Sequence, residues 1–235
     1  MIFIPDFKEK QITDVDHKFH VITRASQLID LHRQHSASYT VNFHGIELVM
    51  LQEVFCPLYG EGSQLLAECL NVQEGEQVLE LGTGSGGLAI LSAAKSGSVV
   101  ATDISPIAVK CTTDNVNRHQ LNYKIDVRQG NLFEPLSFKE KFSLILFNLP
   151  FMNGIPKNWL EVAMYDKNHQ TLSKFFQGVN NYLTEDGRVL IAFSNAGDMD
   201  YLHQLIEGYS FQFKLVNRMK NNLEFVVYEL KKHKL

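Results

Sequence analysis

A glycine-rich turn between two apolar segments limits the folds open to this chain more than any other feature. Residues 77–90 consist of an apolar run that carries one acid, Glu80, then residues 82–87, four of which are glycine, and then a second apolar run. Glycine adopts positive φ and leaves room for a ligand beside the backbone. The pattern predicts a buried strand that turns sharply into a helix, with a ligand bound at the turn.

The glycine spacing alone leaves the identity of this ligand open. Gly82, Gly84 and Gly87 satisfy the dinucleotide fingerprint G-x-G-x-x-G, and Asp103 follows about 20 residues later, where that motif places its ribose acid. Glu80 favours a different ligand, because a carboxylate just before the turn repels a pyrophosphate and attracts an ammonium group. S-adenosylmethionine has an ammonium group and no phosphate.

A second motif lies where a later apolar run ends. Residues 142–147 lead into Asn148-Leu149-Pro150-Phe151. Together with the glycine motif Glu80-Leu81-Gly82-Thr83-Gly84-Ser85-Gly86, this sequence resembles the class I methyltransferases that methylate planar nitrogen, most closely the HemK-like and small-domain methyltransferases. The resemblance covers roughly residues 41–193. The chain departs from it at Leu149, where members usually have Pro, and at Phe151, where they often have Tyr.

The resemblance implies a catalytic group at the second motif. The side-chain carbonyl of Asn148 would accept one N–H of the methyl acceptor, and the main-chain carbonyl of Leu149 would accept another. Pro150 fixes the local turn, and Phe151 would stack on a planar amide or base. The implied cofactor contacts come from the glycine turn and from the ends of the neighbouring strands: Glu80, Gly82, Thr83, Gly84, Gly86, Asp103, Ile104, Asn131 and Asn148.

Three polar residues near these motifs have an alternative structural role. Asp103 ends an expected strand, where it would accept both ribose hydroxyls or simply serve as an acid at the start of the helix that Ser105 opens. Asn131 stands where the resembling proteins usually have Asp, so it would meet the adenine edge or be a plain turn residue. Ser63 is either a helix N-cap or a contact to the methionine end of the cofactor.

The second half of the chain alternates short apolar segments with helical ones. Such alternation favours a parallel sheet with right-handed crossovers. The resemblance implies a Rossmann-like, doubly wound α/β fold with a mostly parallel seven-stranded sheet and an antiparallel C-terminal strand. Residues 211–217 and 223–230 are the strands expected to close this sheet.

A small N-terminal cap is expected to precede the catalytic domain, with the boundary between residues 70 and 71. Residues 23–35 predict a helix. Residues 39–43 and 46–50 alternate in polarity on either side of His44-Gly45, which predicts a β-hairpin. The chain therefore divides into a cap of residues 1–70 and a methyltransferase domain of residues 71–235.

The composition of the chain indicates which partners and which cellular compartment to expect. The net charge of −4 and the isoelectric point near 6.1 argue against a broad nucleic-acid-binding surface. Three cysteines without metal-type spacing indicate a reducing cytoplasm and no metal site. The sequence has no apolar run of membrane-spanning length.

These features predict a cytoplasmic S-adenosylmethionine-dependent N-methyltransferase that acts on a protein glutamine, an RNA base or a small planar metabolite. Methyl transfer from a sulfonium needs no metal, because the donor is already activated and the protein mainly positions the acceptor nitrogen. Two alternatives stay open. A non-catalytic S-adenosylmethionine-binding partner subunit is compatible with the departure at Leu149. An NAD(P)-dependent oxidoreductase is compatible with the glycine turn, although Glu80 and the Asn148 motif argue against it.

Overall fold

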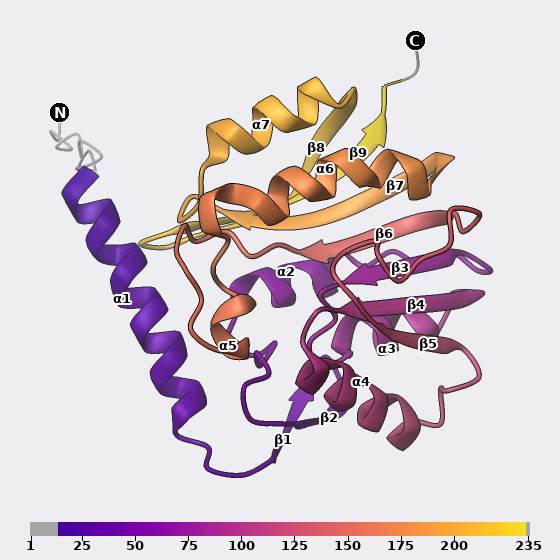
Figure 1. Ribbon diagram of the computed structural model, residues 1–235, viewed down its shortest axis with the longest axis horizontal. Coiled ribbons are helices and arrows are strands. Elements are labelled where there is room, and N and C mark those ends of the chain that lie inside the picture. The colour runs from indigo at the N-terminus through magenta and orange to yellow at the C-terminus, as the bar shows by residue number, and fades with distance from the viewer. Residues whose placement is uncertain (1–13, 234–235) are drawn as a thin grey trace, which may run out of the picture.

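In the computed structural model, which describes residues 14–233, a seven-stranded sheet runs through the centre of the molecule (Figure 1). The strands are β3 (Gln77–Leu81), β4 (Ser98–Asp103), β5 (Ile125–Gln129), β6 (Phe142–Asn148), β7 (Leu183–Ser194), β8 (Phe211–Lys220) and β9 (Glu224–Lys232). Their order is β5-β4-β3-β6-β7-β9-β8, and β9 alone runs in the direction opposite to the other six strands. The predicted doubly wound, mostly parallel sheet is confirmed.

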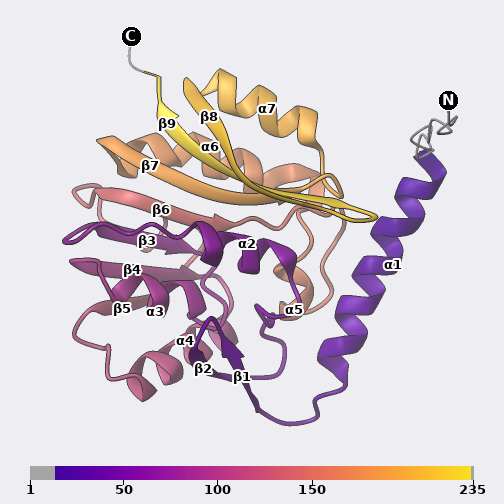
Figure 2. The ribbon, with the colours of Figure 1, turned by 180° about the vertical axis from the view of Figure 1, so that it is seen from behind.

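Helices cover both faces of the sheet (Figures 1 and 2). One face carries α2 (Glu61–Cys69), α3 (Gly87–Ala93) and α4 (Pro106–Arg118), and the other carries α6 (Gln170–Tyr182) and α7 (Met199–Gly208). Successive side chains of a strand point to opposite faces, so each strand contributes to two cores. In β6, Leu144 and Leu146 pack in the first core, whereas Ile145 and Phe147 pack in the second.

Helix boundaries differ from the prediction in three places. Helix α1 (Asp14–Arg33) begins before residue 23, because residues 14–22 contain no Pro or Gly that would break a helix. Helix α5 (Trp159–Val162) was not predicted, since four residues are too few to show a helical period. Helix α7 was also missed, although Asp198 caps it by accepting a hydrogen bond from the Tyr201 N–H.

The hairpin forms as predicted. β1 (Tyr39–Phe43) and β2 (Ile46–Met50) pair antiparallel, and both turn residues, His44 and Gly45, have positive φ. Such a two-residue turn matches the twist of the strands. Phe43 rests against Gly87, the first residue of α3, where an added Cβ would lie 2.9 Å from its ring. The domain boundary at residue 70 stays a prediction, and residues 1–13 of the proposed cap lie outside the described residues.

Buried Asn115 of α4 ties the hairpin to the glycine turn. Its Oδ1 accepts a hydrogen bond from the Val49 N–H at 2.8 Å. Its Nδ2 donates to the carbonyls of Val49, at 3.0 Å, and Ser85, at 2.9 Å. One side chain therefore fixes β2 and the glycine turn against the same helix.

Replacing Asn115 with alanine is expected to lower the free energy of unfolding by about 2 to 4 kcal/mol, since several buried backbone groups lose their partner. Urea unfolding of the variant measures this loss. Asn117→Ala is the matched control, because Asn117 is exposed on the same helix. An equal loss in the two variants would show that the Asn115 contacts contribute nothing specific.

Within residues 14–233, no helix is both long and apolar enough to cross a membrane. Over the same part of the chain, no three His, Cys, Asp or Glu side chains lie close enough together to hold a metal ion. Cys56, Cys69 and Cys111 are free thiols.

Candidate active site

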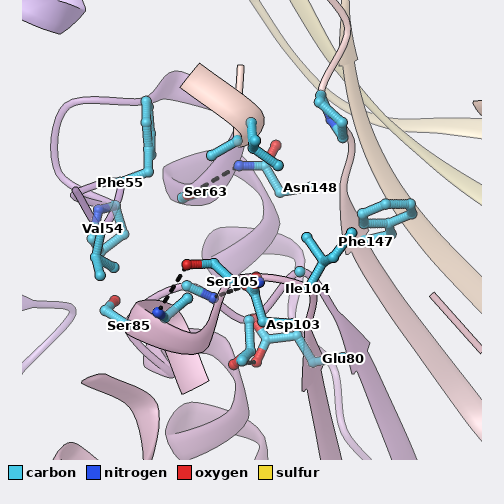
Figure 3. Close-up of a pocket in the computed structure, with 18 of the residues that line it drawn as sticks. Val54, Phe55, Ser63, Glu80, Ser85, Asp103, Ile104, Ser105, Phe147 and Asn148 are labelled. Carbon is cyan, nitrogen blue, oxygen red and sulfur yellow. Dashed lines mark hydrogen bonds between the residues drawn. The ribbon is translucent and has the colours of Figure 1, made fainter. Parts of the chain in front are cut away.

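A cavity of about 170 Å³ opens at the carboxyl ends of the central strands (Figure 3). Open α/β sheets bind ligands at this edge, where neighbouring strands lead to helices on opposite faces. The strand order places that point between β3 and β6. Glu80 of β3 and Asn148 of β6 both line the cavity.

The cavity gathers most of the residues that the sequence singled out. Those lining it are Glu80, Gly82, Thr83, Gly84, Asp103, Ile104, Asn131, Asn148 and Pro150. Gly86 is not part of the lining: it has a φ of 81°, and an added Cβ would lie 2.8 Å from Thr112 of α4. Gly86 therefore allows close packing between the turn and a helix.

Phe151 also lies outside the main cavity. It lines a smaller neighbouring cavity. Its ring packs edge-on against Phe193 and Phe225, with ring centroids 5.8 and 6.1 Å apart. Phe151 therefore lies in the wall of a second cavity, which Asn148 also lines.

The glycine turn is held against the end of β4 by hydrogen bonds that its backbone N–H groups donate. The Thr83 N–H donates to the Thr102 carbonyl at 3.0 Å, and the Gly84 N–H donates to Asp103 Oδ2 at 2.9 Å. Gly82 and Gly84 have φ of 64° and 59°, a region that favours residues without a Cβ. The turn is therefore shaped before any ligand binds.

Asp103 is fixed at the same point. Its Oδ1 accepts the Ser105 N–H at 2.9 Å. Burial raises the pKa of its carboxyl, while the bonds from the Ser105 and Gly84 N–H groups oppose that shift. Ser105 caps α4 as predicted, by accepting the Ala108 N–H. Each Asp103 oxygen keeps a further lone pair for a ligand hydroxyl.

Glu80 is a buried acid at the cavity wall, 3% exposed. Burial raises the pKa of its carboxyl to about 8. Hydrogen bonds from the Thr83 hydroxyl, at 2.7 Å, and from the Ala89 backbone oppose this shift, and the negative charge of Asp103 adds to it. The carboxyl is therefore largely neutral at pH 7, and a cation in the cavity would favour its ionised form.

The amide of Asn148 is held from the start of α2. Its Nδ2 donates to Ser63 Oγ at 3.0 Å (Figure 3). Its Oδ1 is buried and has no hydrogen-bond partner. Gly62 faces that oxygen so closely that an added Cβ would collide with it. Ser63 is not the predicted N-cap, because Gly60 occupies that position; it positions Asn148 instead.

Several lining residues were not predicted from the sequence. They come from the loop before α2, from the segment after β5 and from α5, and include Val54, Phe55, Leu132, Trp159 and Val162. Trp159 is the only tryptophan of the chain, in a long connection between β6 and α6. Long connections of this kind are often functional, and this length is the one feature of the sequence that could have indicated a role for Trp159.

Comparison with known proteins places the chain in a family. The family model described as methyltransferase small domain matches residues 45–229. A provisionally named protein N5-glutamine methyltransferase of Methanocaldococcus jannaschii is 29% identical over 188 residues, which cover 77% of this chain and 92% of that protein. A bifunctional methyltransferase of Rickettsia typhi is 41% identical over 95 residues, 40% of this chain, and the chain spans only 18% of its length.

A solved structure supports the same fold. A 16S rRNA methyltransferase of T. thermophilus, in complex with AdoMet and guanosine, superposes with a TM-score of 0.58 at 21% identity, over 83% of this chain and 50% of that chain. At this identity the likeness shows the fold alone. The family match spans both the glycine turn and the Asn148 motif. The chain therefore belongs to the methyltransferase small domain family, which confirms its resemblance to the S-adenosylmethionine-dependent methyltransferases.

Proposed function

We propose that the chain transfers a methyl group from S-adenosylmethionine to the nitrogen of a primary carboxamide, such as a protein glutamine side chain. The observation that carries this proposal is Asn148 Oδ1, a buried acceptor without a partner beside the main cavity. An N–H of an amide would satisfy it. The name of the relative from Methanocaldococcus jannaschii points to the same class of acceptor. The net charge of −4 favours a protein acceptor over RNA.

The cavity residues fit the cofactor. Asp103 has lone pairs left for the ribose hydroxyls, and the carboxyl of Glu80 suits an ammonium group. Ile104 is 42% exposed and offers an apolar face to the adenine, whereas Asn131 offers its amide to the adenine edge. When bound, the cofactor supplies a methyl group that is already activated.

The chain's own part is to orient the acceptor nitrogen. Asn148 Oδ1 would accept one N–H and the Leu149 carbonyl another, while Pro150 fixes the turn that carries both groups. Phe151 would pack against the acceptor from the smaller cavity. Such contacts hold the nitrogen in line for transfer without a strong base.

S-adenosylhomocysteine is expected to change the fluorescence of Trp159, the only tryptophan, because this residue lines the cavity. Asp103→Ala should weaken the binding about 5- to 150-fold, the effect of losing a charged acceptor for ligand hydroxyls. Asp126→Ala is the control, since Asp126 lies in β5 outside the cavity lining. If Asp103→Ala binds S-adenosylhomocysteine as tightly as wild type, Asp103 serves only to hold the glycine turn and the start of α4. A response to NAD instead would revive the oxidoreductase alternative.

Labelled S-adenosylmethionine and a library of glutamine-containing peptides test the reaction itself. We expect label in peptides and none in the same peptides with Glu in place of Gln. Label in RNA alone would show that the acceptor is an RNA base and not a carboxamide. Cofactor binding without transfer to peptide, RNA or metabolite extract would favour the non-catalytic partner subunit.

The free thiols fit a reducing compartment, and we place the reaction in the cytoplasm. Cys56 and Cys111 are buried. Burial raises the pKa of the Cys111 thiol to about 11 and also raises the pKa of Cys56. Both stay neutral thiols at pH 7, which suits structural cysteines in the cytoplasm.

A further inference from the structure

Asn148 lies between two spaces. It lines the main cavity and also a smaller one of about 30 Å³. By volume the smaller cavity holds about two water molecules. Its walls include one ion pair, between Arg24 and Glu61. The apolar residues of the walls are Leu28, Phe55, Leu149, Phe151, Met152, Ala163, Met164 and Phe225. A space of this kind admits a small planar group and excludes a two-ring base.

Two residues of this small cavity carry a buried polar atom without a partner. One is Asn148 Oδ1, an acceptor, and the other is Arg24 Nε, whose N–H is a donor. Buried polar groups are nearly always hydrogen-bonded, because an unpaired group loses its hydration without compensation. An unpaired donor and an unpaired acceptor on two residues that line the same cavity suit a ligand that has both an acceptor and a donor.

One nitrogen of the Arg24 guanidinium, Nη2, already has two partners. It donates to the Tyr59 carbonyl at 2.6 Å and pairs with Glu61 Oε1 at 2.8 Å. The side chains of Arg24 and Glu61 are only 22% and 21% exposed. The two contacts hold the outer end of the guanidinium and leave Nε free to bind a ligand.

Arg24 reaches the site because α1 packs across it. Ala25 and Leu28 of α1 form a small core with Met152 and Met164, which flank the loop after Asn148. Figures 1 and 2 show α1 beside the edge of the sheet where the central strands end. Helix α1 precedes residues 45–229, so the family match does not include Arg24.

We propose that Arg24 is an acceptor-binding residue whose Nε donates to the oxygen of the carboxamide while Asn148 Oδ1 accepts from its nitrogen. The inference rests on the proposed transfer to a carboxamide. A primary amide fits both atoms, because it is planar and carries a carbonyl acceptor beside N–H donors. A hydrogen bond from a charged guanidinium is stronger than one from a neutral donor. Two attachment points also fix the amide plane, which a single bond to Asn148 would leave free to rotate.

Binding of propionamide and 2-butanone to the protein saturated with S-adenosylhomocysteine tests the assignment without any turnover. NMR titration is expected to show that Arg24→Lys, which keeps the charge for Glu61 but has no Nε, weakens both probes at least 10-fold. Asn148→Ala should weaken propionamide only, because the ketone has the oxygen but no N–H. Arg33→Lys, at the exposed end of α1, is the control. Equal affinity of wild type and Arg24→Lys for both probes would overturn the proposal.

Methyl transfer to the best glutamine peptide gives an independent readout. Arg24→Lys should raise the peptide KM at least 10-fold with the KM for S-adenosylmethionine unchanged. A rise in both KM values would mean that Arg24 only anchors α1, and the proposal would fail. A wild type that methylates RNA and no peptide overturns the carboxamide as the ligand of Arg24. Absence of all transfer would defeat the proposed function, while the propionamide titration would still decide the role of Arg24.

Discussion

Replacing Asn148 with alanine is expected to reduce methyl-transfer turnover at least about 100-fold and to leave cofactor affinity nearly intact. The amide is held by Ser63 and presents an unpaired oxygen, so its loss removes the group that orients the acceptor nitrogen. Turnover is followed with labelled S-adenosylmethionine, and cofactor affinity is followed through Trp159. A variant that turns over like the wild type would refute the catalytic role. Joint loss of melting temperature and cofactor affinity would instead make Asn148 a structural cap before Pro150.

Gly62→Ala checks the same role from the neighbouring helix. An added Cβ would collide with Asn148 Oδ1 and lie 3.3 Å from Ala192. Alanine normally favours a helix over glycine, so a loss of turnover in this variant would come from the displaced amide. Gly208→Ala is the control, because nothing lies within 4 Å of its added Cβ. Equal turnover in the two variants would contradict the position assigned to Asn148.

The parts of the site that the sequence predicts are those built from short segments. The glycine turn, Asp103 and the Ser105 cap lie within one β-α-β stretch, where spacing alone determines which groups meet. The alternation of strands and helices likewise predicts a parallel sheet without reference to the strand order. Signals of this kind can be read from the sequence because the contacts that they produce form within one β-α-β unit, whose geometry is regular.

The parts that could not be predicted depend on contacts between distant segments. Ser63 holds Asn148 across 85 residues, and no local pattern distinguishes that contact from an N-cap. Arg24 approaches the same site from α1, whose apolar residues gave no sign of their partner. Phe151 follows Pro150 directly, yet packing against Phe193 and Phe225 places its ring in the smaller cavity. Tertiary packing decided each of these positions.

Cofactor affinity is expected to rise about 20-fold between pH 6 and pH 7.5, because the cofactor's ammonium group binds ionised Glu80 and the pKa of that carboxyl lies at about 8. Below the pKa, binding must release the proton of Glu80, so affinity follows the fraction of carboxylate. The ammonium group itself stays largely protonated over this range. Titration of S-adenosylhomocysteine by Trp159 fluorescence at each pH measures the effect.

Glu80→Gln separates the ionisation of Glu80 from any contribution of the other acids that line the cavity, Asp103 and Glu53. The variant keeps Asp103 and imitates the neutral carboxyl of Glu80. Its affinity should therefore lie below that of wild type, stay constant between pH 6 and pH 7.5, and fall further behind as the pH rises. A wild type with constant affinity over this range would exclude Glu80 as the partner of the ammonium group. A pH dependence that persists in Glu80→Gln would belong to a group other than Glu80.

Ionisation of Glu80 should lower the stability of the ligand-free protein as the pH rises, whereas it raises the affinity for the cofactor. The pKa of Glu80 is raised above its ordinary value of 4.5 to about 8, so the fold favours the neutral carboxyl. Its stabilising contribution is complete below pH 4.5 and is lost as the pH rises through 8. Without ligand, Glu80→Gln should therefore gain melting temperature relative to wild type between pH 5 and pH 9. A variant that binds the cofactor less tightly yet melts higher cannot owe its weaker binding to a damaged fold, and this combination would identify Glu80 as a buried acid kept for a cationic ligand.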